Sequence, residues 1–219
     1  MINIARYINH TLLRPDTTES DIIRLCEEAK QYNFASVCIA PCWEYVVRNL
    51  LQEEDNLNLC VVQNFPHGNT NIVNGMKLDW ADEIDFVINI GYVKSGMWRS
   101  VKGDLWSMRN MGGKDKIVKV IVEVGHLTDE ELFRVADMLI EEKIDFIKTC
   151  TGYGPRNVTV DDIVKIKKHV GDRIKIKASG GIKTYEFAKQ LIDAGADRLG
   201  TSSSIDIIRG ASSTDQSGY

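Results

Sequence analysis

Two lysines interrupt segments that otherwise have the apolar, β-branched character of buried strands. Lys148 lies in residues 145–152, DFIKTCTG, and Lys177 lies in residues 174–181, IKIKASGG. If these segments form neighbouring strands, repulsion and loss of hydration disfavour both charged amines and lower the pKa of at least one of them. A neutral lysine amine attacks a carbonyl and forms a Schiff base, which is an electron sink for making or breaking an adjacent carbon–carbon bond. The two segments therefore predict carbonyl chemistry at a lysine.

Further charged residues follow the period of two that places alternate side chains of a strand on one face. With the lysine face turned inward, the interior also holds Asp85, Glu123 and Lys119. Isolated charges within such apolar segments are costly to bury unless they are paired, so these groups are expected to meet. We expect Asp85 to be the general acid and base that relays protons to and from water.

The same charges also have interpretations without chemistry. Lys119 and Lys175 could belong to buried ion pairs, or could extend from the lower rim into water. Glu123 ends its segment and could either hold a lysine in place or form a purely structural ion pair. Lys148 and Lys177 differ from these because they lie close to the carboxyl ends of their segments, where parallel α/β folds keep their active sites.

Glycine-rich endings follow the second lysine segment and the last strand-like segment. The first is Ser179-Gly180-Gly181, and the second is residues 200–203, GTSS, with a short helical stretch behind it. Glycines let a backbone approach an anion closely, and a helix N-terminus favours negative charge. Gly-Gly and Ser-Ser are also ordinary turn residues. Because both stretches follow consecutive strands, we favour a phosphate site over plain loops.

The elements that position these residues alternate regularly along the chain. Eight strand-like segments are expected at residues 7–13, 35–40, 57–65, 83–90, 116–124, 145–151, 173–180 and 198–203. Segments with helical periodicity follow them at residues 17–33, 41–55, 69–80, 95–111, 128–143, 159–170, 184–195 and 204–210. Most of these open with Thr, Ser, Asp or Pro, as helices prefer. Eight βα units predict a single (β/α)8 TIM barrel, with a doubly wound open sheet as the alternative. We expect residues 1–208 to form the barrel domain and residues 209–219 a flexible tail.

Composition narrows the classes of partner. The chain has 219 residues and a formal net charge of −4, spread without a basic patch, so no nucleic acid or membrane partner is expected. No signal sequence or long apolar segment is present, which favours a cytoplasmic protein. The five cysteines include no CxxC pair and are expected to be reduced thiols. The four histidines are too far apart in sequence for the usual metal-ligand spacings.

A family resemblance rests on several motifs in order. They are INHTLLRPD, FASVCIAP, NFPHGNT, ADEIDFVINIG, KVIVEVGHLTDEE, DFIKTCTGYG, KASGGIKT and GADRLGTSS. Together they cover about residues 8 to 205, and the chain resembles deoxyribose-phosphate aldolase. The resemblance implies a class I aldolase on a TIM barrel that needs neither a metal nor an organic cofactor. It implies reversible cleavage of 2-deoxy-D-ribose 5-phosphate to acetaldehyde and D-glyceraldehyde 3-phosphate, with a homodimer as one candidate assembly.

The resemblance also implies roles for individual residues. Lys148 is similar to the Schiff-base lysine, Lys177 to the second lysine that lowers its pKa, and Asp85 to the proton-relaying aspartate. The positions that match the substrate and phosphate sites are Thr11, Cys38, Gly180, Gly181, Gly200, Ser202 and Ser203. Tyr219 resembles a terminal tyrosine that assists proton transfer in some members; otherwise it belongs to a disordered end.

Three departures from the family pattern affect these expectations. Asn9 replaces an aspartate, so a carboxylate near the second lysine is missing; the helix at residues 69–80 is short; and Tyr153 stands where some members have a phosphate-binding lysine. Two other functions therefore stay open. One is a different Schiff-base lyase or transferase on the same fold, and the other is a non-catalytic protein that binds a phosphorylated sugar.

Overall fold

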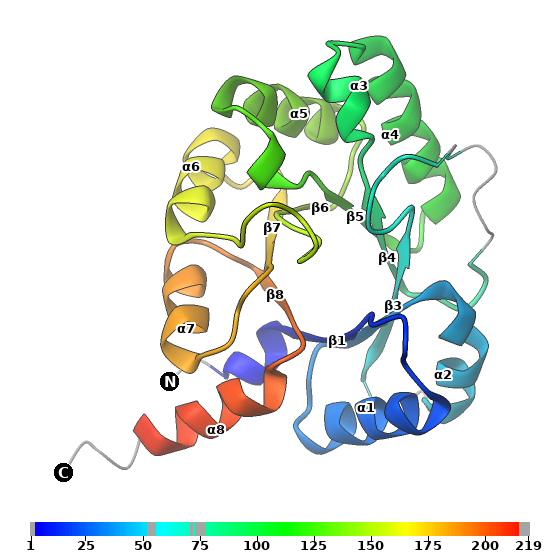
Figure 1. Ribbon diagram of the computed structural model, residues 1–219, viewed down its shortest axis with the longest axis vertical. Coiled ribbons are helices and arrows are strands. Elements are labelled where there is room, and N and C mark those ends of the chain that lie inside the picture. Colours follow the sequence, from blue (N-terminus) through cyan, green and yellow to red (C-terminus); the bar gives the residue numbers. More distant parts are fainter. Residues whose placement is uncertain (1–2, 52–55, 71, 73–77, 215–219) are drawn as a thin grey trace.

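Eight parallel strands close into a barrel in which each strand pairs with the next and β8 pairs with β1 (Figure 1). The computed structural model describes residues 3–51, 56–70, 72 and 78–214. The strands are β1 (Ile8–Leu12), β2 (Ser36–Ile39), β3 (Asn58–Gln63), β4 (Glu83–Val87), β5 (Ile117–Ile121), β6 (Phe146–Lys148), β7 (Lys175–Ser179) and β8 (Arg198–Thr201). All eight lie within the predicted segments. The (β/α)8 prediction is confirmed, and the doubly wound alternative is wrong.

Helices surround the barrel, and all of them except the short helix Ile90–Lys94 overlap a segment that the sequence predicts to be helical. They are α1 (Glu19–Gln31), α2 (Glu44–Leu50), α3 (Ile90–Lys94), α4 (Trp98–Gly112), α5 (Asp129–Glu141), α6 (Val160–Val170), α7 (Tyr185–Asp193) and α8 (Ser204–Thr214). Short 3-10 turns are η1 (Ile4–Tyr7), η2 (Pro41–Trp43) and η5 (Val124–His126). Thr18, Thr128 and Thr159 each form a capping box with an acidic residue three positions later, which satisfies otherwise unpaired N–H groups at the starts of α1, α5 and α6.

Two boundaries differ from the expectations, and one expected helix is not tested. β4 ends at Val87, and Asn89 then caps α3 by accepting a hydrogen bond from the Tyr92 N–H, so the strand is shorter than residues 83–90. Most of the helix expected at residues 69–80 lies outside the described residues. α8 continues to Thr214, so the tail expected at residues 209–219 begins inside this helix, and residues 215–219 lie outside the described part.

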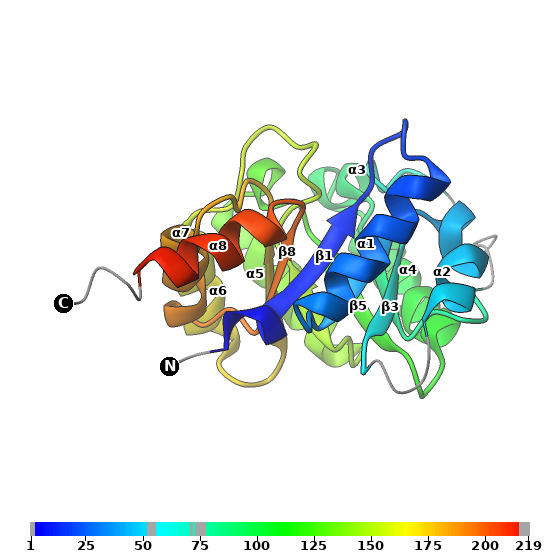
Figure 2. The ribbon, with the colours of Figure 1, turned by 90° about the horizontal axis from the view of Figure 1, so that it is seen from below.

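The two faces of each strand have different compositions. The outward face packs against the helices through residues such as Ile84, Phe86, Ile147 and Ile176, which belong to one apolar core. Figure 2 shows β1 from the side, between α8 and α1. The inward face instead carries charged and small polar side chains, together with a small cluster around Cys38 that is separate from the main core. Among the described residues, no helix combines the length and the apolar character needed to cross a membrane.

Candidate active site

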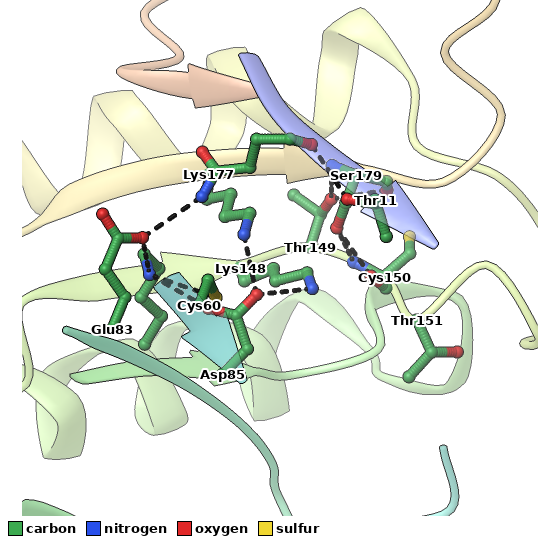
Figure 3. A network of polar contacts seen from close by, with 12 residues as sticks. Thr11, Cys60, Glu83, Asp85, Lys148, Thr149, Cys150, Thr151, Lys177 and Ser179 are labelled. Carbon is green, nitrogen blue, oxygen red and sulfur yellow. Dashed lines mark hydrogen bonds and ion pairs between the residues drawn. The ribbon is translucent and has the colours of Figure 1, made fainter. Parts of the chain in front are cut away.

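Asp85 lies at the centre of a buried charge network inside the barrel (Figure 3). Its Oδ2 accepts hydrogen bonds from the Nζ atoms of Lys148 and Lys177, each at 2.7 Å. Its Oδ1 lies 3.1 Å from the Lys119 Nζ and accepts a hydrogen bond from the Cys60 thiol at 3.2 Å. Lys148 and Lys177 are paired residues on β6 and β7, so their side chains leave the sheet side by side on the same face. The predicted meeting of Asp85 with the three lysines is therefore present.

Glu83 is a second buried carboxylate in the network, and it is not among the residues predicted from the sequence. Its Oε2 lies 2.5 Å from the Lys119 Nζ and accepts a hydrogen bond from the Asn9 amide at 3.2 Å. Its Oε1 accepts another from the Asn58 amide at 2.8 Å. Glu83 is two positions before Asp85 and so shares its face, which is the signal that could have identified it. Asn9 therefore contacts a carboxylate directly.

Charge balance in this interior leaves one cation in excess among the described residues, because three lysines face two carboxylates. Burial disfavours the ionised form of Asp85, but Lys119, Lys148 and Lys177 outweigh it and hold the pKa of Asp85 well below its usual value. Burial also opposes the charged form of Lys177, yet Asp85 and the nearby thiols raise the pKa of Lys177. The repulsion between Lys148 and Lys177 therefore does not act alone, because the Asp85 carboxylate lies between the two amines.

Replacing Lys119 by methionine is expected to destabilise the fold by about 3 to 5 kcal/mol, because Glu83 loses its buried cation. Adding Glu83→Gln should recover part of that loss, since the unpaired charge is then gone. Chemical denaturation of the two variants measures this difference. Lys165→Met is the control, because its pair with Asp129 is exposed and such pairs contribute at most about 1 kcal/mol. A double variant less stable than Lys119→Met would contradict this account.

The same network gives stability a defined pH range. Burial opposes ionised Glu83, but Lys119 and Lys177 prevail, so the pKa values of Glu83 and Asp85 are lower than in the unfolded chain. Their contribution is present above about pH 4 and is lost as the pH falls through the folded-state values. The pKa values of Lys119 and Lys177 are raised despite burial, mainly by Asp85. Their contribution is present below about pH 10.4 and is lost as the pH rises through the folded-state values.

A cavity of about 250 Å³ opens above Lys148 at the carboxyl ends of the strands. The sequence-predicted residues that line it are Thr11, Lys148, Gly180, Gly181, Gly200, Ser202 and Ser203. Arg14, Lys183 and Tyr153 line it as well. Arg14 and Lys183 add positive charge, and neither is among the residues predicted from the sequence. Lys183 directly follows the SGGI motif, which could have indicated it.

Local structure explains why glycine occupies three positions that line this cavity. Gly180 has φ +100° and Gly181 has φ +75°, a region that favours glycine, and a Cβ at Gly181 would lie 2.3 Å from the Asn157 Cγ. At Gly200 a Cβ would lie 3.2 Å from the Lys177 Cε, tighter than most side-chain contacts. Gly180 and Gly181 therefore shape the loop after β7, while Gly200 leaves space for the second lysine.

Hydrogen bonds between the ends of β6 and β7 fix the loop above the lysines. Thr149 Oγ1 donates to the Ser179 carbonyl at 3.0 Å and accepts from the Ser179 N–H at 2.9 Å. Ser179 Oγ donates to the Cys150 carbonyl at 2.6 Å. Both side chains are buried. These bonds connect the end of β7 to the residues that directly follow Lys148.

Several predicted residues lie elsewhere. Glu123 is buried but contacts Thr151 instead of a lysine, because it has φ +53° after the end of β5 and breaks the strand alternation. Lys175 is exposed at the start of β7, at the opposite end of the strand from the cavity. Cys38 is fully buried in β2 against Cys60 and Val62, and does not line the cavity. Tyr219 lies outside the described residues.

Known proteins share nearly the whole length of this chain. No protein-family model matches it. A deoxyribose-phosphate aldolase of Methanocella arvoryzae is 45% identical over 216 residues, covering 95% of this chain and 96% of that protein. One of Caldanaerobacter subterraneus is 41% identical over 218 residues, covering 95% and 93%. The solved structure of an aldolase named QR15 has a TM-score of 0.92 at 32% identity and covers 100% of both chains. This chain belongs to the deoxyribose-phosphate aldolase family.

Proposed function

We propose that this protein is a deoxyribose-phosphate aldolase that cleaves 2-deoxy-D-ribose 5-phosphate reversibly through a Schiff base on Lys148. The observation that carries the proposal is the placement of Lys148, whose Nζ lies 2.7 Å from Asp85 while its side chain lines the cavity. Of the three interior lysines, Lys148 is the one that lines this cavity, while Lys119 and Lys177 are fully buried. Attack on a carbonyl requires the neutral form of this amine, and Lys177 lies beside it at the paired position of the next strand.

The reaction begins when the neutral amine of Lys148 attacks the aldehyde carbon of the open-chain sugar. Loss of water gives an iminium ion, which withdraws the electron pair of the bond between the second and third carbons as that bond breaks. The hydroxyl proton on the third carbon leaves at the same time, and glyceraldehyde 3-phosphate departs. The resulting enamine takes up a proton and is hydrolysed to acetaldehyde. Asp85 contacts both Lys148 and Lys177, so protons pass between these groups without long movements.

The phosphate end of the substrate is proposed to lie against the loops after β7 and β8. Gly180, Gly181, Ser202 and Ser203 line this end of the cavity, and Lys183 adds a cation beside them. Backbone N–H groups in glycine-rich loops and at a helix N-terminus bind phosphate without a dedicated side chain. Tyr153 does not supply a charge, and its hydroxyl donates to the Leu13 carbonyl at 3.3 Å.

Trapping with acetaldehyde and borohydride tests the proposal. Borohydride reduces an iminium ion to a stable amine, and mass spectrometry then maps the ethyl group to a lysine. We expect the adduct on Lys148, together with release of glyceraldehyde 3-phosphate from deoxyribose 5-phosphate. A sugar-binding protein without chemistry would give no adduct on any lysine. An adduct on Lys148 without turnover of deoxyribose 5-phosphate would favour the other Schiff-base lyase or transferase.

His10 contacts the residue that follows the proposed phosphate-binding loop after β8. Loss of the His10 side chain should weaken phosphate binding. Its Nε2 pairs with Glu28 and its Nδ1 with the Ser204 hydroxyl, both at 2.8 Å, at the start of α8. Burial lowers the pKa of His10, so the ring is neutral at pH 7 and donates to the carboxylate while accepting from Ser204. We expect His10→Gln to raise KM for deoxyribose 5-phosphate by about tenfold.

Steady-state kinetics with deoxyribose 5-phosphate and with unphosphorylated deoxyribose separate this effect from general damage. The unphosphorylated sugar should react equally well with the wild type and with His10→Gln. His169→Gln is the control, because His169 pairs with Asp137 on the outside of the barrel. An equal loss with both sugars would show that His10 acts on the fold as a whole.

The compartment and the assembly are further proposals. None of the five cysteines forms a disulfide in the structure, which is typical of proteins in reducing compartments such as the cytoplasm. For the assembly we propose a homodimer in which a second copy covers the exposed Tyr45 and Trp80. These two rings pack edge to face with centroids 5.6 Å apart. Light scattering in solution measures the molar mass, and a monomer would contradict the dimer.

A further inference from the structure

Two buried cysteines face each other inside the barrel beside the charge network. Cys38 in β2 and Cys60 in β3 are paired in the parallel register, and both are fully buried. The two sulfur atoms lie within 4.8 Å of each other and of an Asp85 carboxylate oxygen. Neighbouring strands are about 4.8 Å apart, within the range of about 4.4 to 6.8 Å between Cα atoms that a disulfide requires.

We propose that Cys38 and Cys60 form a reactive dithiol that hydrogen peroxide converts into a cross-strand disulfide, a reversible modification that lowers catalytic activity. The Cys38 thiolate attacks one peroxide oxygen, giving a sulfenic acid and a hydroxide ion. The Cys60 sulfur then attacks the sulfenic sulfur, the sulfur–sulfur bond forms, and the leaving hydroxide takes up the Cys60 proton as water. In sum the two thiols lose two electrons and two protons, and the peroxide becomes two molecules of water.

The surroundings of the two sulfur atoms predict different reactivities for the two thiols. The neighbouring Cys60 thiol, helped by Lys177, lowers the pKa of Cys38 to about 7, so thiolate is available near neutral pH. Burial and the neighbouring Cys38 raise the pKa of Cys60. Cys38 is therefore the thiol that meets the oxidant, and Cys60 is the one that resolves the intermediate.

A small oxidant has a short route to the pair. A second cavity of about 650 Å³ lies beside the first and is lined by Leu13, Val62 and Phe65, among others. Val62 belongs to the same buried cluster as Cys38 and Cys60, and Leu13 and Phe65 pack against that cluster. The side chains that line this cavity therefore also contact the cluster that holds the two thiols, and we expect peroxide to reach the thiols when these side chains move.

Cys38, Cys60 and Asp85 also have the spacing of a metal site, but their surroundings favour a disulfide. Asp85 already receives three lysine ammonium groups, and the Lys119 Nζ lies 3.8 Å from the Cys60 sulfur. A metal cation placed among these ammonium groups would be repelled, and its carboxylate ligand is already paired. A disulfide carries no charge and meets no such repulsion.

Disulfide formation removes a hydrogen bond from Asp85. In the reduced protein the Cys60 thiol donates to Oδ1 of Asp85 at 3.2 Å, and a disulfide sulfur has no proton to donate. Because hydrogen bonds to charged groups are the stronger ones, we expect the oxidised protein to turn over about tenfold more slowly. This effect on activity rests on the proposed function, whereas formation of the disulfide does not.

The experiment treats the full-length Cys42→Ser protein with hydrogen peroxide, then alkylates free thiols in denaturant and maps the peptides by mass spectrometry. Cys42 is exposed and lies on the same tryptic peptide as Cys38, so its removal makes the assignment unambiguous. We expect a Cys38 peptide joined to a Cys60 peptide, two hydrogen atoms lighter than the reduced pair. Dithiothreitol should separate the peptides and restore activity.

A matched variant distinguishes a resolving thiol from simple oxidation damage. In Cys60→Ser, which keeps a hydrogen-bond donor but lacks a thiol, oxidised Cys38 has no partner and proceeds to sulfinic acid, so dithiothreitol should not restore the activity lost to peroxide. Alkylation of both cysteines after peroxide, or sulfinic acid on Cys38 beside a free Cys60, would overturn the proposal. An inactive protein that still forms the disulfide would count against the proposed function alone. A disulfide without loss of activity would overturn the proposed effect on catalysis.

Discussion

Replacing Lys148 by arginine is expected to lower kcat for deoxyribose 5-phosphate by roughly five orders of magnitude, as loss of an enzyme's nucleophile does elsewhere. Arginine keeps a positive charge beside Asp85, so the ion pair at 2.7 Å can be retained and the barrel should still fold. A guanidinium does not lose its proton in proteins and cannot form the iminium ion. The measurements are the rate of glyceraldehyde 3-phosphate release and the yield of the borohydride-trapped adduct, both of which should vanish.

The control for this variant is Lys165→Arg, because Lys165 is exposed and pairs with Asp129 outside the barrel. Thermal unfolding of both variants should stay close to that of the parent protein, which separates loss of chemistry from loss of fold. An adduct that moves to Lys177 with measurable turnover would mean that the second lysine is the nucleophile. In that case the assignment made from access to the cavity is wrong.

Much of the barrel architecture could be predicted from local patterns of apolar and polar residues in the sequence. The eight strands are recognisable as compact apolar segments, and most of them are followed by a helical segment with a threonine, serine, aspartate or proline start. The strand period of two was enough to bring Asp85, Lys119, Lys148 and Lys177 to one face, as the structure has them. That periodicity holds wherever the chain stays in regular extended conformation.

Prediction failed where the backbone leaves that regular conformation or where a partner lies far away in sequence. Glu123 has a left-handed φ just beyond β5. The alternation of side chains along the strand, which predicted that Glu123 faces inward toward the lysines, therefore does not extend to it. The short helix α3 was hidden in an apolar run, because only the Asn89 cap reveals its start. The contact between His10 and Ser204 joins the first strand, β1, to the start of the last helix, α8. No local sequence pattern connects residues so far apart along the chain.

Replacing Asp85 by asparagine is expected to separate bond formation from turnover. The variant keeps the size of the side chain but leaves Lys119, Lys148 and Lys177 with Glu83 as the one buried carboxylate among the groups described in this network. We expect kcat to fall by about three orders of magnitude, because proton transfer loses its acceptor. Losing the carboxylate that raises the pKa of Lys177 should lower that pKa, and a neutral amine then forms more readily in the cluster.

Adduct formation with acetaldehyde should therefore persist in Asp85→Asn at neutral pH while deoxyribose 5-phosphate cleavage nearly stops. The experiment measures borohydride-trapped adduct and kcat across pH, with Asp137→Asn as control, since Asp137 pairs with His169 on the surface. Unfolding by denaturant should show a loss of about 3 to 5 kcal/mol from the unpaired buried cations. If the adduct disappears together with turnover, Asp85 acts by placing Lys148 and not by carrying protons. The two roles differ because Oδ2 touches both lysines, and only a proton carrier needs that shared contact.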